Sequence, residues 1–325
     1  MQAVSGPPQP NCAHAGPGIS DCGHANEGCC TSSAVMGGTY YRTYDVGPAG
    51  ESEGIDRLAD GGSGGDVDQA TVSSFQLDKY DVTVGRFRQF VLAWNGGKGY
   101  LPAAGSGKHT HLNGGQGLAN GATPGSFETG WLTSNNSNVA PTDSNLGSCS
   151  PESTWTTSPG SQETLPINCV SWSEAYAFCI WDGGFLPSEA EWEYAAAGGS
   201  QQRQYPWGST APGSSNQYAI YDCYYPSGSD ACGGLASIAP VGSAPGGAGL
   251  WGQLDLAGDM WQWNLDWSAP YVNPCMDCAY LKVATSVVIR GGGYDNIASA
   301  LYPPLRSSFV GTREHNLGIR CARAP

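Results

Sequence analysis

Apolar side chains recur at helical spacing in the segment that begins at Thr83. The members of this apolar face are Val84, Phe87, Val91 and Trp94. Thr83 offers an N-cap hydroxyl, and Gly96–Gly97 offers the backbone freedom at which helices commonly end. The spacing predicts an amphipathic helix between these two signals.

Two further helices are predicted from capping boxes, in which an N-cap serine is followed three residues later by a glutamate. Ser171 with Glu174 opens the first helix, and Gly183–Gly184 closes it. Ser188 with Glu191 opens the second, which the sequence EAEWEYAAAGG carries to its terminal glycines. Each helix is thus bounded at both ends by a local signal.

Alternating apolar and polar residues predict strands, the first within residues 37–46 and another within residues 72–82. The glycine-rich residues 61–69 are expected to form a flexible loop. Residues 100–168 are mostly Gly, Ser, Thr and Asn, so we expect a long irregular insertion. Within it, Trp131 and Trp155 are candidates for exposed recognition, with core packing favoured for Trp155.

The composition is typical of a globular protein rich in loops and turns. The 325 residues include 48 Gly and 22 Pro, and only 13% of them are charged, against roughly 25% in ordinary domains. The 11 Trp and 16 Tyr supply apolar surface that disordered chains lack. We expect a Cys-, Gly- and Pro-rich arm at residues 1–35, followed by one domain at residues 36–325.

Charge and hydropathy argue against two classes of partner. The net charge is −14, from 28 acidic and 14 basic residues, and Lys and Arg form no cluster. The phosphate contacts that dominate nucleic-acid affinity are therefore missing. No apolar run approaches the length of a membrane span, and residues 1–30 contain no charged-then-apolar leader. We expect a mature form from which an export signal has been removed.

The cysteines favour disulfides over metal ligation. There are 12 of them, an even number, and Cys275–Cys278 is the only CxxC motif, so a zinc site lacks its second pair. We expect a tight disulfide there and consider Cys223 with Cys232 a candidate pair. Disulfides require an oxidising compartment. The protein is thus predicted to be exported, to the periplasm, the cell surface or the extracellular medium.

A histidine pair in a glycine-rich loop is a candidate metal site. His109 and His111 stand two residues apart in GSGKHTHLNGG, and alternate residues of an extended chain share a face. Histidine is a common ligand of transition metals, although a catalytic site needs a third ligand, for example His315 or Asp295. The alternative is a polar loop with ordinary hydrogen-bonding histidines.

Several multi-residue motifs carry a family resemblance. They are FQLDKYDVT, LPSEAEWEYA, YPWG, WGQLDLAGDMWQW and NLGIRCA, and the likeness extends over about residues 34–325. With these motifs the chain resembles the formylglycine-generating enzyme family, also called sulfatase-modifying factors. The resemblance implies an α+β, C-type lectin-like fold with little regular secondary structure and long disulfide-stabilised loops. It also implies a disulfide between Cys179 and Cys321.

The same resemblance points to what the chain lacks. The enzyme that gives the family its name carries two copper-binding, redox-active cysteines shortly after the motif that corresponds to Gly291–Tyr294. Here residues 295–301 read DNIASAL, and no cysteine lies between Cys278 and Cys321. Because Cu(I) requires soft sulfur ligands, we expect no formylglycine-generating activity.

The resemblance also implies a calcium site in WGQLDLAGDMWQW. Asp255 would supply a carboxylate, Gly258 and Met260 backbone carbonyls, and Gln262 a side-chain amide oxygen. Calcium takes about six to eight oxygen ligands of these types. Asp255 stands where the family has Asn, and Gln262 stands where the family has Glu. The set therefore keeps one negative charge, but at a different position. The alternative is a turn that glycine and tryptophan packing holds without an ion.

Two functions from different classes follow from these patterns. The first is an exported binding or structural module, outside the cell or at its surface, with a protein, peptide or glycan partner. The second is a metal-dependent oxidoreductase with non-heme iron or copper at His109 and His111, in the groove where the family binds its substrate. The fold alone cannot choose between them.

Overall fold

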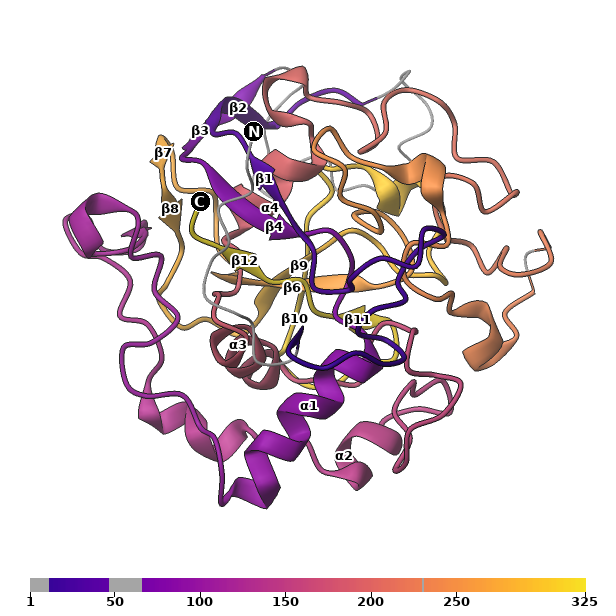
Figure 1. The fold of residues 1–325 in the computed structure, drawn as a ribbon. Helices are drawn as coiled ribbons and strands as arrows, with labels where there is room; N and C mark the ends of the chain where they lie inside the picture. Colours follow the sequence, from indigo (N-terminus) through magenta and orange to yellow (C-terminus); the bar gives the residue numbers. More distant parts are fainter. Residues whose placement is uncertain (1–11, 47–65, 230) are drawn as a thin grey trace.

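The computed structural model describes residues 12–46, 66–229 and 231–325. Within these ranges, short strands form four small sheets with helices between them (Figure 1). The α-helices are α1 Val84–Trp94, α2 Asp143–Gly147, α3 Trp172–Trp181 and α4 Glu189–Ala196. The strands are β1 Ser32–Val35, β2 Gly38–Thr43, β3 Val67–Val72, β4 Phe75–Asp78, β5 Ala119–Asn120, β6 Trp261–Trp267, β7 Cys275–Met276, β8 Cys278–Ala279, β9 Val287–Arg290, β10 Ser307–Phe309, β11 Leu317–Gly318 and β12 Ala322–Arg323.

The three predicted helices are confirmed as α1, α3 and α4. The Thr83 side chain accepts a hydrogen bond from the Arg86 backbone at 3.2 Å, and α1 ends at Asn95 in the left-handed conformation. In α3 and α4 both hydrogen bonds of the capping box are present. These caps satisfy backbone N–H groups that have no partner within the helix. Local sequence is therefore enough to define the helix starts.

The strand predictions need two corrections. β1 precedes the predicted first strand and pairs with β4. β3 begins at Val67, inside the predicted flexible loop, of which residues 61–65 lie outside the described residues. β3 forms because Ala70 and Val72 both point into the core while its backbone pairs with β2.

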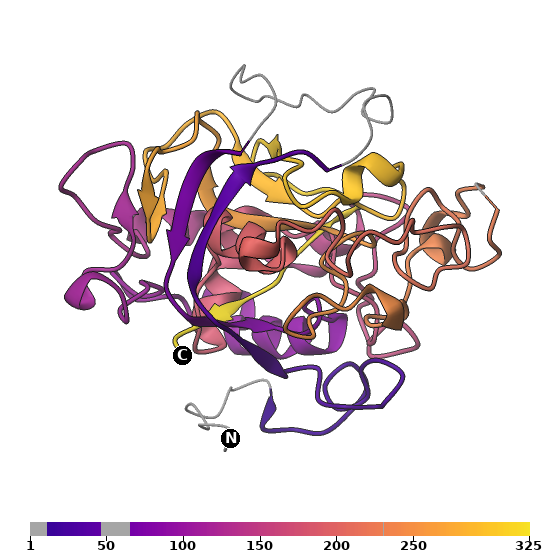
Figure 2. The same cartoon turned by 90° about the horizontal axis from the view of Figure 1, so that it is seen from above.

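β4 joins segments that lie far apart in the sequence. It pairs antiparallel with β1 on one side and β12 on the other, so that Leu77 lies between Ser33 and Ala322. A second sheet, in the order β10-β9-β6-β11, buries every residue of β6 except Trp267. β2 and β3 form a curved ribbon along one side of the molecule (Figure 2). α4 contacts β2, β3, β6 and β9, and so connects this ribbon to the second sheet.

All 12 cysteines are paired in disulfides. The pairs are Cys12–Cys30, Cys22–Cys29, Cys149–Cys169, Cys179–Cys321, Cys223–Cys232 and Cys275–Cys278. The bridge from Cys179 to Cys321 ties α3 to the residue before β12 and is the pairing that the family resemblance implies. The other bridges span much shorter stretches of sequence.

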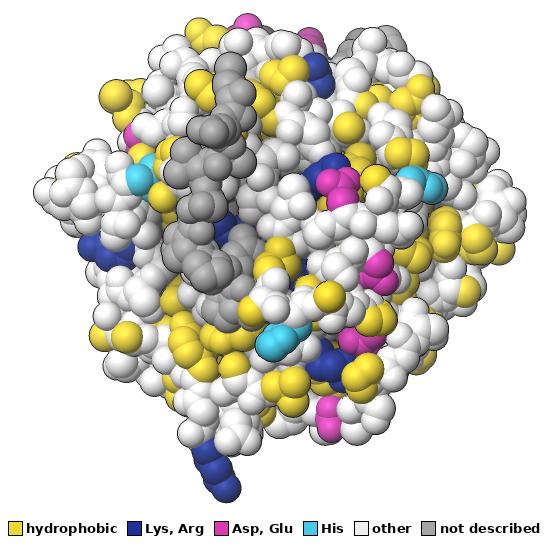
Figure 3. Space-filling view, viewed as in Figure 1, with side chains coloured by type: hydrophobic (Ala, Val, Ile, Leu, Met, Phe, Trp, Pro, Cys, Tyr) yellow, Lys and Arg dark blue, Asp and Glu magenta, His cyan; other side chains and the backbone are white. Residues whose placement is uncertain are grey.

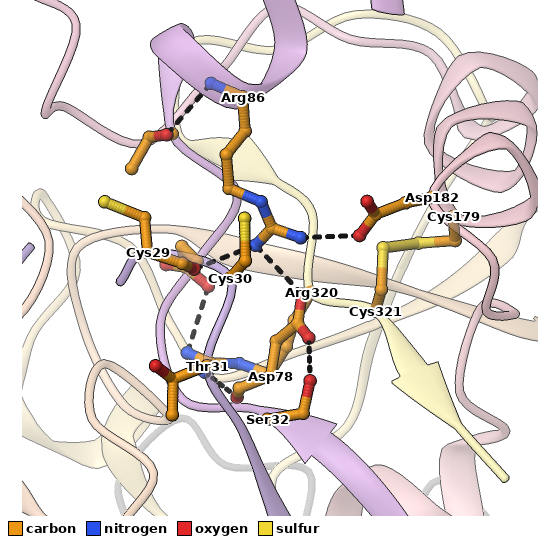
Figure 4. A network of polar contacts seen from close by, with 12 residues as sticks. Cys29, Cys30, Thr31, Ser32, Asp78, Arg86, Cys179, Asp182, Arg320 and Cys321 are labelled. Atoms are coloured by element: carbon orange, nitrogen blue, oxygen red, sulfur yellow. Dashed lines mark hydrogen bonds and ion pairs between the residues drawn. A yellow bond between two sulfur atoms is a disulfide. The ribbon is translucent and has the colours of Figure 1, made fainter. Parts of the chain in front are cut away.

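Both disulfides of the N-terminal arm close within the arm itself. Other contacts, among them those of Arg86, therefore attach its described part to the rest of the domain. Arg86 of α1 donates to the Cys29 carbonyl at 3.2 Å and reaches Asp78 at 3.0 Å and Asp182 at 2.7 Å (Figure 4). Among the described residues, Asp78, Asp182 and Cys321 are grouped closely enough for a metal ion. The Cys321 sulfur is bridged, however, and the guanidinium already pairs with both carboxylates, so this cluster is structural.

The insertion of residues 100–168 is anchored by its tryptophans. Trp131 is only 1% exposed, packs edge-on against Tyr176 at 5.4 Å between ring centroids, and donates to Asn136 at 2.8 Å. Trp155 is 6% exposed. The hypothesis that Trp131 forms an exposed recognition surface is therefore wrong, because its ring fills the core beneath the insertion.

The surface carries few charges. On the face seen in Figure 3, acidic and basic side chains are scattered among uncharged polar and apolar ones, and Lys and Arg do not cluster there. Among the described helices, none has both the length and the apolar character that crossing a bilayer requires.

Candidate functional site

A polar network follows Gly291–Tyr294, where the family resemblance places reactive cysteines. Asp295 Oδ1 accepts a hydrogen bond from Asn316 at 2.9 Å, and Asp295 Oδ2 lies 3.2 Å from His315 Nε2. His315 Nδ1 lies 3.2 Å from Glu314 Oε2. The side chains of Asp295, His315 and Glu314 are 24%, 31% and 38% exposed. The hydrogen bond with Asp295 raises the pKa of His315 and favours its imidazolium form.

Groups without redox chemistry occupy the neighbouring positions. Asn296 Oδ1 accepts hydrogen bonds from Trp261 Nε1 at 2.6 Å and from Gly293 N at 2.9 Å. Leu301 is 1% exposed and packs in an apolar cluster that includes Tyr302. A hydrogen-bonded turn and an apolar contact therefore stand where thiol chemistry would need accessible cysteines.

Two disulfide-closed loops border this network. In the loop of residues 149–169, Asn168 Nδ2 donates to the His315 carbonyl at 2.6 Å. In the loop of residues 223–232, the backbone N–H of Cys223 donates to the Tyr294 carbonyl at 2.8 Å. Both bridges thus hold segments that contact the network directly. We call this region, with residues 294–296 and 314–316 at its centre, the acidic site.

Glu152 adds a third carboxylate to the acidic site. Its carbonyl accepts a hydrogen bond from Asn168 at 2.9 Å. A hydrogen bond from Ser150, and more weakly the charge of His315, lower the pKa of Glu152. With Asp295 and Glu314, three carboxylates lie around His315, so the site is negative even when His315 is protonated, and it is suited to a positively charged group. Glu152 and Asn168 could not be predicted as members of this site from the sequence, because only the tertiary fold brings them here.

His109 is fully buried and bridges two glutamates. Its Nδ1 lies 3.0 Å from Glu128 Oε2, and its Nε2 lies 3.1 Å from Glu191 Oε2. Glu191 belongs to the capping box of α4, whereas Glu128 lies in the insertion and also accepts from the Leu118 backbone at 2.8 Å. Burial alone would lower the pKa of His109, but the two carboxylates outweigh it and raise this pKa to about 10. A buried imidazolium therefore links the insertion to α4.

The rings of His109 and His111 are not placed to bind one metal ion together. The two ring centroids are 6.2 Å apart, and Phe185 packs on both rings, with its centroid 3.7 Å from His109 and 5.6 Å from His111. The ring nitrogens of His111 are buried without a protein partner, and burial lowers its pKa. The hypothesis of a metal shared by this pair does not fit the structure, because both nitrogens of His109 already face carboxylates.

A further buried network surrounds Arg290. Its guanidinium reaches Glu189 at 2.6 Å, Glu193 at 2.8 Å and the Tyr271 hydroxyl at 2.7 Å. Burial raises the pKa of Glu193 to about 8 despite the neighbouring arginine, and burial raises the pKa of Asp266 to about 7. Both carboxyl groups therefore retain protons near neutral pH that an unfolded chain would release.

We expect the free energy of unfolding to fall by about 3 kcal/mol or more between about pH 5 and pH 10. A group whose pKa is raised by folding stabilises the protein fully below its unfolded pKa, and this stabilisation is lost as the pH passes its folded value. This stabilisation is lost in turn as the pH passes the folded pKa values of three groups, which are about 7 for Asp266, about 8 for Glu193 and about 10 for His109. Urea unfolding at constant ionic strength measures the effect. Stability that is constant or rises over this range would contradict it.

The residues implied as calcium ligands lie in the turn that leads into β6. Asp255 Oδ2 accepts a hydrogen bond from Gly242 N at 2.7 Å, and the Gly258 carbonyl accepts one from Met260 N at 2.9 Å. Gln262 Oε1 accepts hydrogen bonds from two other side chains, at 2.6 and 2.9 Å. An amide oxygen has only two lone pairs. Gln262 therefore has none left for an ion, and the set does not fit calcium as the resemblance implied.

Comparison with known proteins relates the chain to one family along most of its length. The family model described as "Sulfatase-modifying factor enzyme 1-like domain" matches residues 24–325. The formylglycine-generating enzyme of Streptomyces coelicolor is 39% identical over 166 residues, 48% of this chain and 52% of that protein. A Mus musculus protein described as inactive C-alpha-formylglycine-generating enzyme 2 is 32% identical over 158 residues, 49% of each chain. The chain thus spans about half the length of these relatives.

A solved structure supports the same fold. PvdO from Pseudomonas aeruginosa aligns with 96% of this chain and 100% of its own, at 19% sequence identity and a TM-score of 0.56. At this identity the likeness concerns the fold alone. Together with the family match, it confirms the predicted α+β, C-type lectin-like architecture.

Proposed function

This chain belongs to the family of sulfatase-modifying factor enzyme 1-like domains, and on that basis we propose that it is an exported member that binds a partner and does not generate formylglycine. One observation carries the proposal: all 12 cysteines are in disulfides. Residues 295–301, which follow Gly291–Tyr294, contain no cysteine where the resemblance places the family's reactive thiols. The nucleophilic and metal-binding form of cysteine is the thiolate, and no cysteine here is free to form one.

Membership of the family does not by itself bring the activity. The mouse relative named above is described as inactive. Residues 295–301 contain no cysteine, and Asn296 and Leu301 within this segment are engaged in hydrogen bonds and in apolar packing, which supports the same conclusion for this chain. The disulfides support export, because such bridges persist in oxidising compartments and are rare in reducing ones.

The absence of formylglycine-generating activity is open to direct assay. The purified chain, supplied with Cu(I), dioxygen, an electron donor and a cysteine-containing substrate peptide of the Streptomyces coelicolor enzyme, should leave the peptide mass unchanged, while that enzyme converts it in parallel. Thiol titration of the denatured chain should find no free thiol. Conversion of the peptide above the level without protein would overturn the proposal.

The acidic site is the proposed place of recognition. Its carboxylates, Glu152, Asp295 and Glu314, are partly exposed and face one histidine, so a partner that presents positive charge complements it.

Affinity for a Lys- and Arg-containing peptide should fall about tenfold in Asp295→Asn and weaken as salt rises. Asp66→Asn, which removes an exposed carboxylate before β3, is the matched control. Equal affinity of the two variants would argue against this site.

A relative described as hercynine oxygenase, from Mycolicibacterium thermoresistibile and 31% identical over 154 residues, supports an oxidoreductase as the alternative function, but the contacts of His109 and His111 do not favour a metal between them. A metal there would have to displace the contacts of His109 with Glu128 and Glu191, which bury three charged side chains together. Separating such a group is costly because each charge would remain in a medium of low dielectric constant. The pair is better explained as part of the fold.

A further inference from the structure

The guanidinium of Arg320 lies fully buried at the turn where the resemblance implies calcium. Five oxygen atoms accept hydrogen bonds from it: Asp78 O at 2.8 Å, Asp81 Oδ1 at 3.1 Å, Leu254 O at 2.7 Å, Asp255 O at 2.9 Å and Gln262 Oε1 at 2.9 Å. Three are backbone carbonyls, one is a carboxylate oxygen and one is an amide oxygen. These are the ligand types that calcium selects in proteins.

Gln262 is oriented toward this guanidinium and away from any shared ion. Its Oε1 accepts from Trp192 Nε1 at 2.6 Å as well as from Arg320. Its Nε2 donates to the Asp255 carbonyl at 2.7 Å. The amide therefore uses its oxygen for Arg320 and its nitrogen to close the turn. A glutamate would lack this nitrogen donor.

The carboxylates of the turn point to backbone amides. Asp255 accepts from Gly242 N at 2.7 Å, and Asp259 accepts from Ala239 N at 3.1 Å. In the described parts of the chain, the ligand atoms of Asp81, Asp255 and Asp259 do not gather within 4.8 Å of one another, the spacing met by the set at Asp78, Asp182 and Cys321. The acidic residues of the turn thus do not form a cation cage.

We infer that Arg320 takes the place of the divalent cation in this chain. Its guanidinium supplies the positive charge on which the oxygen atoms of residues 254–262 converge, so the turn is ordered without calcium. A planar guanidinium offers five N–H donors in fixed directions. Here Nε donates to one acceptor and Nη1 to another, while the two N–H groups of Nη2 are shared among three acceptors. An ion and Arg320 would compete for the same oxygens, Gln262 Oε1 and Asp255 O.

The wild-type chain provides the first test. After chelation and exchange into calcium-free buffer, elemental analysis should find far less than one calcium per chain, and millimolar calcium should leave the melting temperature unchanged. An ion present at about a thousand times its Kd would raise the melting temperature of a chain of this size by roughly 5 °C. One tightly held equivalent of calcium, or a melting temperature that falls on chelation, would overturn the inference.

Arg320→Lys provides the second test, because it keeps the charge and loses most of the fixed donors. Its melting temperature should fall by roughly 5 °C or more. Arg203→Lys, a part-buried arginine bonded to Gln201 and Pro206, should fall less. A fall no larger than that of Arg203→Lys would contradict the inference. If this variant does not fold, the wild-type calcium measurements decide the question.

Discussion

Replacing His109 with glutamine is expected to lower the free energy of unfolding by about 3–5 kcal/mol. The substitution removes a buried cation that faces two carboxylates, and the Glu128 and Glu191 side chains are only 2% and 3% exposed. Both would then be buried without a counter-charge. Glutamine can still donate hydrogen bonds through its amide nitrogen, so the loss reports the charge more than the shape.

Urea unfolding at pH 7 measures this effect, and His315→Gln is the matched control. His315 also lies between two carboxylates, but its side chain is 31% exposed, and ion pairs in water contribute about 0–1 kcal/mol. A similar loss in both variants, or a loss below about 1 kcal/mol in His109→Gln, would show that the buried triad is not a major source of stability.

Removal of the Cys179–Cys321 bridge by double alanine substitution is expected to lower the free energy of unfolding by about 5 kcal/mol. The bridge joins residues separated by 142 positions, and a long loop gains the most chain entropy when it is released in the unfolded state. The loss should also loosen the segment that leads into β12, since Cys321 immediately precedes it.

The bridge between Cys275 and Cys278 is the control, because its residues are separated by only three positions. Its removal should cost about 2 kcal/mol. Unfolding of both double variants by urea, followed by fluorescence of the many tryptophans, gives the two values. Equal losses would contradict the dependence on loop length, and a larger loss for the short bridge would reverse it.

The helices could be predicted from the sequence because their signals are local. Thr83, Ser171 and Ser188 act within three residues of themselves, so no tertiary contact is needed to recognise a helix start. β1 and β3 are harder to predict, because a strand of four to six residues carries little periodicity of its own. Its existence depends on a partner strand that the local sequence does not identify.

The candidate site could be predicted only in part. The motif around Gly291–Tyr294 located it through the family resemblance, and the segment that follows showed the loss of the thiols. Glu152 and Asn168 could not be predicted, because they reach the site from a loop whose path depends on the Cys149–Cys169 disulfide and on tertiary contacts. The sequence makes His109 a candidate metal ligand because its spacing to His111 is visible, whereas its contact with Glu191 depends on how α4 packs.

The position of β4 between β1 and β12 constrains how the domain matures. Leu77 pairs with Ser33 and with Ala322, so the sheet lacks one of its strands until almost the whole domain has left the ribosome. Such long-range pairing slows folding and favours completion after synthesis. A chain that remains unfolded while it emerges can still pass through a secretion channel, which is compatible with the export proposed above.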